Sequence, residues 1–206
     1  MALIDNPHGF RVYGECLHVG YYVVPTAPTI NLSVGDMVQG DNTSVLSKHL
    51  GLAPSVDDAA TISTTLGADY LLFGAVVGCF DENMDPIQYI PALRTGDGTV
   101  AGYLAVADDP DQEFEAQVDG ELTDANFELN YEITVTATTN APNSRTGLST
   151  QEIAVAGENV TATIPIRLVR QLDPDESHAS AGCRIVCKIN PLCHRYGAGT
   201  VPQTGD

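Results

Sequence analysis

The sequence predicts an all-β protein, an antiparallel β-sandwich or barrel-like domain with an extended N-terminal arm and at most one short helix. Many short segments rich in β-branched and aromatic residues alternate with turn segments rich in Gly, Pro, Asp and Asn. The chain of 206 residues contains 19 Gly and 12 Pro, which is a turn-rich content. One segment carries apolar residues at helical spacing.

The chain begins with a segment that has no periodic apolar face. Residues 1–16 contain Pro7 and Gly9 and are expected to form an extended arm. A single β-rich domain is expected over 17–206. Its first strand is predicted over 18–24, where two Tyr and three Val favour extended structure.

The segment 55–66 has the features of a helix and features that oppose one. Ser55 and Asp58 have the spacing of a capping box, and apolar residues recur at helical spacing after them. The segment is also rich in Thr and Ser, which helices tolerate poorly. A helix and a non-helical structure both remain open here.

From residue 69 onward we expect β-structure throughout. Turn compositions at 81–86, 95–98 and 108–111 separate the β-forming segments. Apolar and polar residues alternate over 127–135, which predicts a strand with one wet face. The strands of this part are expected over 70–80, 87–90, 100–107, 113–118, 127–135, 162–171 and 183–189.

The net charge of −18 restricts the class of partner. Two of the nine bases are Lys, and so few cations exclude binding to the phosphate backbone of nucleic acid or to an anionic membrane surface. No apolar run reaches the ~18 residues of a membrane span, and the start lacks a signal-peptide pattern. The odd number of cysteines, five, is typical of a reducing cytoplasm, where we expect the protein to be made.

Carboxylates are concentrated in the middle of the chain. Fourteen of the 27 lie between Asp81 and Glu132, beside one base, Arg94. A glycosidase needs two carboxylates at a fixed separation, but the chain has no Trp for a sugar-stacking platform. Glu113 and Glu115 share one face of an expected strand, so a solvated acidic face is the favoured interpretation.

The segment from Asp108 to Glu113 offers the hard oxygen ligands that calcium prefers. It lacks the residue order of an EF-hand loop. A turn between two strands, with Pro110 fixing φ, explains the same residues and is the favoured interpretation. A calcium site shared between loops is the alternative.

Cys183, Cys187 and Cys193 with His194 have ligand types that zinc accepts. In a strand, however, Cys183 and Cys187 lie about 13 Å apart at ~3.3 Å per residue, too far to ligate one metal. Ile185 shares their face, so we expect the thiols to line a core. The chain has no Gly-x-Ser-x-Gly elbow and no phosphate-binding glycine loop. We therefore predict no catalytic, cofactor-binding or metal-ligating residue, and a protein that is not an enzyme.

Several segments resemble one family of viral proteins. They are residues 6–11 (NPHGFR), 89–92 (YIPA), 108–117 (DDPDQEFEAQ) and 186–190 (VCKIN). Over most of residues 69–199 the chain resembles the capsid cement, or head decoration, proteins of tailed bacteriophages. The segment 25–66 has no counterpart in that family, and the five cysteines are not typical of it.

The resemblance implies a non-enzymatic β-rich protein that binds the outer surface of a phage head and clamps neighbouring capsomers. The implied partner is the phage major capsid protein, and the implied location is the outer capsid surface of the virion, after synthesis in the host cytoplasm. Self-association is expected, with a trimer favoured over a dimer because it suits a three-fold junction of capsomers. No cofactor, nucleic acid or membrane is expected.

Two groups of residues are the candidates for an interface. Phe10, Arg11, Val12 and Tyr13 lie in the arm, which we expect to add a strand to the sheet of a neighbouring molecule. Five of the nine bases fall in the last forty residues, and Arg184, Lys188 and Arg195 are the candidates among them. These bases either pair with the acidic middle of another copy or neutralise acids within one molecule.

Two other functions remain as alternatives. One is a tail-tube or head-to-tail component, which is also structural. The other is a carbohydrate- or calcium-binding protein that uses the acidic loops.

Overall fold

The computed structural model describes residues 8–28, 31–40, 56–58, 72–123, 127, 129–135, 142, 146–160, 164–172 and 182–194. In these residues the regular structure consists of β-strands, and no helix is long and apolar enough to cross a membrane. The strands are β1 (Arg11–Val12), β2 (Val19–Pro25), β3 (Leu32–Ser33), β4 (Met37–Gly40), β5 (Val56–Asp58), β6 (Leu72–Phe80), β7 (Pro86–Ile87), β8 (Tyr89–Ile90), β9 (Val100–Ala107), β10 (Glu113–Gln117), β11 (Asn130–Val135), β12 (Gln151–Asn159), β13 (Ile166–Gln171) and β14 (Arg184–Ile189).

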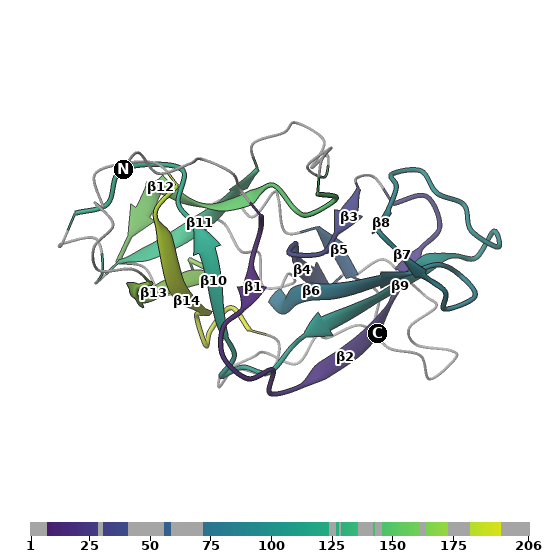
Figure 1. The fold of residues 1–206 in the computed structure, drawn as a ribbon, viewed down its shortest axis with the longest axis horizontal. Coiled ribbons are helices and arrows are strands. Elements are labelled where there is room, and N and C mark those ends of the chain that lie inside the picture. The colour runs from purple at the N-terminus through teal and green to yellow at the C-terminus, as the bar shows by residue number, and fades with distance from the viewer. Residues whose placement is uncertain are drawn as a thin grey trace, which may run out of the picture.

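The first sheet contains six antiparallel strands in the order β1-β10-β14-β13-β11-β12. It curls, because a parallel bridge joins Val118, just after β10, to Ile153 of β12 at the opposite edge. The Asp119 N–H also donates to the Ile153 carbonyl, at 3.0 Å. Phe114 and Tyr131 are fully buried inside the curl. The first sheet therefore encloses its core in a barrel-like manner (Figure 1).

The second sheet contains the strands β2-β9-β6-β4-β5, with β7 paired to β6, and a small separate pair is formed by β3 and β8. Its two end strands, β2 and β5, come into contact, so this sheet also curls. Its core includes Tyr22, Phe73, Val76 and Leu104, all buried. The two sheets lie side by side along the long axis of the molecule (Figure 1). The all-β class with antiparallel sheets is confirmed.

A polar seam, defined here as the buried contacts between the two sheets, joins them. The Gln151 side chain accepts the Met37 N–H at 2.7 Å and donates to the Met37 carbonyl at 3.4 Å. Beyond β14, His194 Nε2 bonds to the Phe73 carbonyl at 3.0 Å. Gln151 and His194 are fully buried, and their bonds satisfy backbone groups that water cannot reach. The two sheets also share apolar packing, because Met37, Leu72, Ala75 and Ala107 of the second sheet lie in the core of the first. The seam and this shared core together make one body of the two sheets.

Of the two structures left open over 55–66, the non-helical one is present where the structure describes that segment. Val56–Asp58 form β5, which pairs antiparallel with β4 in the register Val38↔Asp58. Pairing with β4 supplies backbone partners to a stretch whose Thr and Ser content gives little helical preference. Residues 59–66 lie outside the described part of the chain.

Most expected strands are confirmed, and β9 begins and ends where the sequence places it. Five strands were not expected, β1, β3, β4, β5 and β12. In β12 Gln151, Glu152 and Ile153 are all buried, so the apolar–polar alternation that marks a half-buried strand is missing. The seam buries Gln151, and a local pattern cannot show that.

Candidate interaction surface

The block that carries the family resemblance, residues 108–117, connects the two sheets. Asp108 follows β9 and is buried, and its carboxylate accepts a hydrogen bond from the Tyr22 hydroxyl. His18 Nδ1 donates to the other carboxylate oxygen at 2.5 Å. This bond raises the pKa of His18 above its usual value, because Asp108 stabilises the imidazolium. Asp108 therefore ties the start of β2 to the junction between the sheets.

The predicted turn at 108–111 is confirmed. Asp109 Oδ1 accepts the Asp111 N–H at 2.8 Å, and the Asp109 carbonyl accepts the Gln112 N–H at 3.1 Å. The buried Gln112 side chain then holds the arm, since its Oε1 accepts the Leu17 N–H at 3.0 Å and its Nε2 donates to the Glu15 carbonyl at 3.3 Å. The polar groups of the block are used to build the junction.

The arm pairs with its own chain over the residues described. In β1, Arg11 and Val12 pair antiparallel with Glu115 and Phe114 of β10. Phe10 is buried in the first core, and its N–H donates to the Gly35 carbonyl at 2.7 Å. The expectation of a loose arm that adds a strand to a neighbouring molecule is therefore wrong for residues 8–16. The backbone groups and side chains that it needs are used within the chain.

The outer side of the first sheet carries most of the described bases. Side chains directly opposite each other in paired strands share one side of a sheet, which places Arg11 beside Glu115 and Lys188 beside both Glu113 and Arg167. We call this side the basic face. Five of the six Lys and Arg that the structure describes lie on it, together with four acids, of which Glu152 is buried. Its charged residues are Arg11, Glu113, Glu115, Glu132, Glu152, Arg167, Arg170, Arg184 and Lys188.

Two of these bases have acid partners on the neighbouring strand. Arg184 lies 3.4 Å from Glu115, and Lys188 lies 3.8 Å from Glu113. For Arg184 and Lys188, neutralisation within one molecule is confirmed. The acids of β10 form the half-exposed face expected from the alternation, while Phe114 between them is buried.

Three further bases of the basic face, Arg11, Arg167 and Arg170, are exposed. Arg170 lies over the ring of Tyr13, 5.1 Å from its centroid, so these side chains reach across the two strands that separate β1 from β13. Arg167 lies directly opposite Lys188. Of the predicted interface residues, Arg11, Tyr13, Arg184 and Lys188 therefore come together, Phe10 is buried, Val12 faces the core in part, and Arg195 lies outside the described residues.

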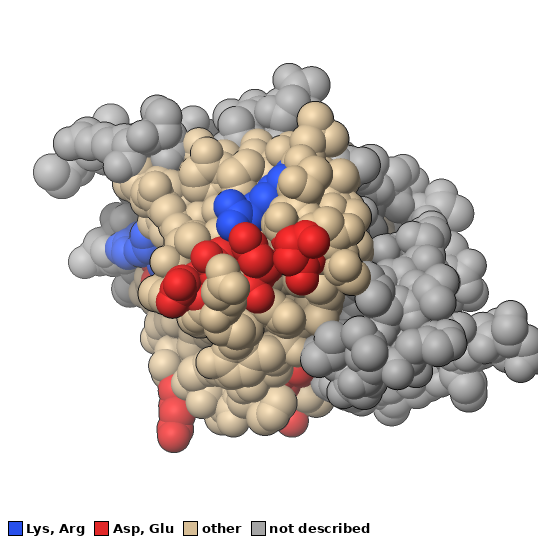
Figure 2. Space-filling view, turned by 90° about the vertical axis from the view of Figure 1, so that its right-hand side faces the viewer, with Lys and Arg blue, Asp and Glu red and all other residues tan. Residues whose placement is uncertain are grey.

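At the far end of the second sheet lie two loops, residues 81–86 and 91–99, which we call the end loops. Figure 2 shows carboxylates gathered around a single base on this end of the molecule. That base, Arg94, donates to Glu82 at 2.7 Å and to the Ala101 carbonyl at 2.9 Å, and so ties the two loops together. The end loops contain four acids and one base, namely Asp81, Glu82, Asp85, Asp97 and Arg94.

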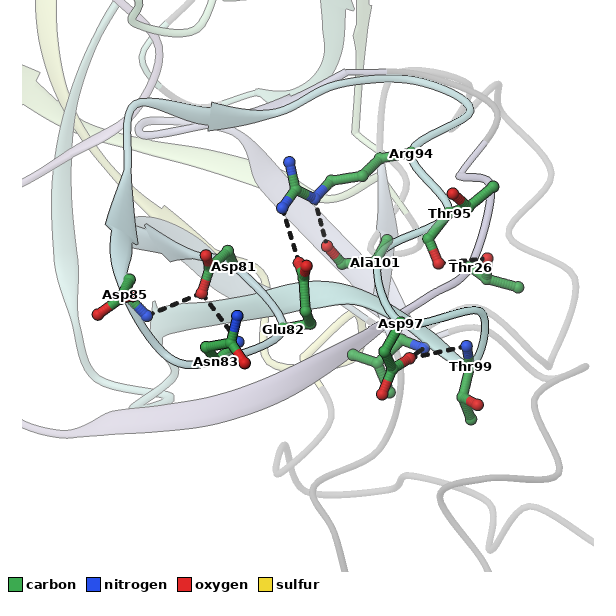
Figure 3. Close-up of polar contacts among 11 residues, drawn as sticks. Thr26, Asp81, Glu82, Asn83, Asp85, Arg94, Thr95, Asp97, Thr99 and Ala101 are labelled. Carbon is green, nitrogen blue, oxygen red and sulfur yellow. Dashed lines mark hydrogen bonds and ion pairs between the residues drawn. The ribbon is translucent and has the colours of Figure 1, made fainter.

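Some acids of the end loops shape the backbone. Asp81 accepts the N–H groups of Asn83 and Asp85, and Asp97 accepts those of Thr99 and Val100 (Figure 3). These bonds lower the pKa of Asp97, since they favour its charged form. The carboxylates thus fix the turns while keeping their charge.

The cysteines of the C-terminal part line the core, as expected. Cys183, Cys187 and Cys193 are fully buried with free thiols, and burial raises the pKa of Cys193 to about 12. Of the other two cysteines, Cys79 is buried, and burial raises its pKa to about 12. Cys16 is exposed. Among the described residues, no three His, Cys, Asp or Glu side chains come together as metal ligands.

Comparison of the chain with protein-family models, with curated proteins and with solved structures gives no match. The chemistry of the surface therefore has to be taken from its own residues. Sequence reasoning identified three of the bases on the basic face, Arg11, Arg184 and Lys188, as interface residues but left Arg167 and Arg170 out of that list. The sequence signal that could have found Arg167 is the alternation of apolar and charged residues at the start of β13. Ile166 and Leu168 are buried there, and Arg167 between them is exposed.

Proposed function

We propose that this protein is a structural protein of a phage particle, a capsid cement or decoration protein that binds the outside of the head and stabilises contacts between capsomers. The observation that carries the proposal is the division of charge over the surface. A chain of net charge −18 places five of its six described bases on one sheet face and an acidic pair of loops at the other end. Such a molecule has a defined orientation in an electric field set by its neighbours.

The use of the chemically versatile side chains supports a structural role. Asp108 and Gln112, in the block that resembles cement proteins, hold the two sheets and the arm together. Carboxylates of the end loops cap turns, and four of the five thiols are buried. In the described part of the chain, the acidic and cysteine residues that were candidates for catalysis or metal binding thus make contacts that stabilise the fold.

The net charge fits assembly from a pool of free copies. A protein made in many copies must stay soluble until it binds, and a net charge of −18 keeps identical molecules apart. The basic face is a positively charged region on this negatively charged molecule, and it can attract an acidic surface despite the overall repulsion. Binding is accordingly expected to weaken as salt screens the charges.

The test is binding of the purified full-length protein to phage heads that lack their decoration protein, measured by co-sedimentation and by the change in head stability on heating. We expect saturable binding that raises the temperature at which the heads open. A protein that stays in the supernatant at every concentration, and leaves head stability unchanged, would contradict the proposal.

A further inference from the structure

The basic face contains more positive charge than its own acids neutralise. Its five bases outnumber its four acids, and Glu115 and Glu113 are the partners of Arg184 and Lys188. The other two acids, Glu132 and Glu152, lie on β11 and β12, and Glu152 is buried. Arg11, Arg167 and Arg170 remain exposed in a chain with three times more acids than bases. An acidic surface is therefore the complement of this face.

The register of the sheet adds a second sign of a missing partner. Lys188 and Arg167 lie directly opposite each other on paired strands. Like charges in this position destabilise a sheet, by roughly 0.2–1 kcal/mol relative to a neutral pair. Glu113, 3.8 Å from Lys188, offsets part of that repulsion. Arg167 is exposed, and a further anionic group beside it would relieve the rest.

The end loops have the chemistry of such a partner. Asp85 and Asp97 are exposed there, next to two exposed apolar side chains, Met84 at 46% and Leu93 at 72%. Arg94 ties the two loops to each other, so these side chains belong to one end of the molecule. The end loops therefore present apolar groups with acids beside them.

The backbone of the end loops holds these apolar side chains at unusual positions. Met84 has φ +66° and Leu93 has φ +60°, in the left-handed region that Gly and Asn usually occupy. A large apolar residue there costs conformational energy and, in the free chain, also exposes apolar surface. The backbone conformation closes contacts within the chain, since the Met84 N–H donates to the Asp81 carbonyl and the Leu93 N–H to the Pro28 carbonyl. The exposed apolar side chains have no such role in the free chain, and contact with another surface would cover them.

We propose that the end loops of one copy dock on the basic face of a second copy. Asp85 and Asp97 then approach Arg167 and its neighbours, and Met84 and Leu93 cover apolar surface such as the exposed Val169. The two surfaces lie on different sheets of the same chain (Figure 1). The contact is therefore head-to-tail, and it closes into a ring when the rotation between copies permits.

This proposal deepens the proposed structural function and rests on it for its setting, a layer of neighbouring copies on a head. Its test uses the isolated full-length protein. A failure of self-association and a failure of head binding are therefore separate results.

The experiment is sedimentation velocity over a range of protein concentrations, at about 0.05 M and about 0.5 M NaCl. We expect reversible association that weakens at the higher salt. Arg167→Glu should weaken it by about tenfold, because one charge contact becomes repulsive. The control, Leu17→Glu with Leu192→Glu, changes the net charge equally at two exposed positions off the face and should associate more strongly than Arg167→Glu.

Two further variants distinguish docking from misfolding. Met84→Gly with Leu93→Gly removes the apolar groups and suits the backbone at positive φ, so stability is kept while association falls by about tenfold. Asp85→Lys should also weaken association. Mixing it with Arg167→Glu should restore a mixed complex, because the unaltered end loops of the Arg167→Glu copy then meet the unaltered basic face of the Asp85→Lys copy.

A monomer at all concentrations, or unchanged association of both Arg167→Glu and the double glycine variant, would overturn the proposal. If the isolated protein is monomeric but Arg167→Glu abolishes head binding, the basic face binds the capsid, and docking between copies is overturned. Association that is lost in each variant and recovered in the charge-swapped mixture would establish it.

Discussion

Asp108 is a buried acid that the fold uses as an anchor between segments far apart in the chain. Its two oxygens take hydrogen bonds from Tyr22 and His18, 86 and 90 residues away. Gly20 makes room for this arrangement, since a Cβ on it would lie 2.5 Å from Asp108 Oδ2. A carboxylate with two donors is stabilised in a place where an unpaired charge would be costly.

The bond between His18 and Asp108 makes stability depend on pH. The pKa of His18 is raised above its usual 6.5 in the folded protein, chiefly by the hydrogen bond to Asp108. The contribution of this bond is therefore complete below pH 6.5 and is lost as the pH rises through the folded pKa. We expect the stability difference between the wild type and His18→Gln to fall between about pH 5.5 and about pH 8.5, measured by urea unfolding.

His8 provides the matched control for this titration. Its pKa is lowered, first by burial and then by the nearby Arg11, so its contribution has the opposite pH dependence. The stability difference between the wild type and His8→Gln should therefore rise as the pH increases towards about 6.5 and stay level above it. Equal slopes for the two variants would show that the His18 bond does not form in solution.

At the scale of single elements, β1 shows how a segment without a sequence pattern becomes part of a sheet. Two residues pair with β10, and Phe10 before them fills the first core. The sequence predicts an arm because so short a strand gives no alternation to detect. The edge of β10 supplies the pairing, and this edge exists only after the sheet has formed.

Phe10→Ala tests whether the arm belongs to the fold. Removing a fully buried Phe should lower the free energy of unfolding by about 3–5 kcal/mol, from lost burial and the cavity left behind. The neighbouring Arg11→Ala is the control, because Arg11 is exposed and should change stability by no more than about 0.5 kcal/mol. Chemical denaturation followed by tyrosine fluorescence gives both values. A Phe10→Ala protein as stable as the wild type would mean that the arm is detached in solution.

At the scale of the whole molecule, the polar seam decides whether the two sheets act as one body. The core of the first sheet includes Met37 and Leu72 of the second, and the contacts between the sheets also include backbone groups held by Gln151 and His194. Buried polar groups of this kind fix one arrangement, because any other leaves donors and acceptors without partners. A rigid relation between the two sheets keeps the basic face and the end loops at a fixed separation.

Gln151→Ala tests the seam. The change removes both bonds to Met37 and leaves its buried N–H and carbonyl without these partners, so unfolding should become easier by about 2 kcal/mol. Gln88→Ala is the control, since Gln88 is exposed and makes one long bond, 3.3 Å, to the Thr146 carbonyl. Hydrogen exchange should show faster exchange at Met37 in the first variant only. Unchanged exchange and stability would show that the seam does not couple the sheets.

The sequence by itself determined the class of the fold, the places of most strands and the character of their faces. Glu113 and Glu115 were expected on a wet face and Cys183 and Cys187 on a core face, because alternation is a local property that each strand carries. The turn at 108–111 was also local, set by Asp109 and its neighbours.

Only the tertiary structure decided which strands meet and what their side chains face. It buried Phe10, and it formed the strand β12 from a segment whose buried residues include polar ones. It paired β5 with β4 in a segment that could have been helical, and it placed Arg167 opposite Lys188. These facts depend on strand order and register, which join residues far apart in the chain. The charge of −18 was in the composition, but its division between a basic face and acidic end loops arose when the strands were assembled.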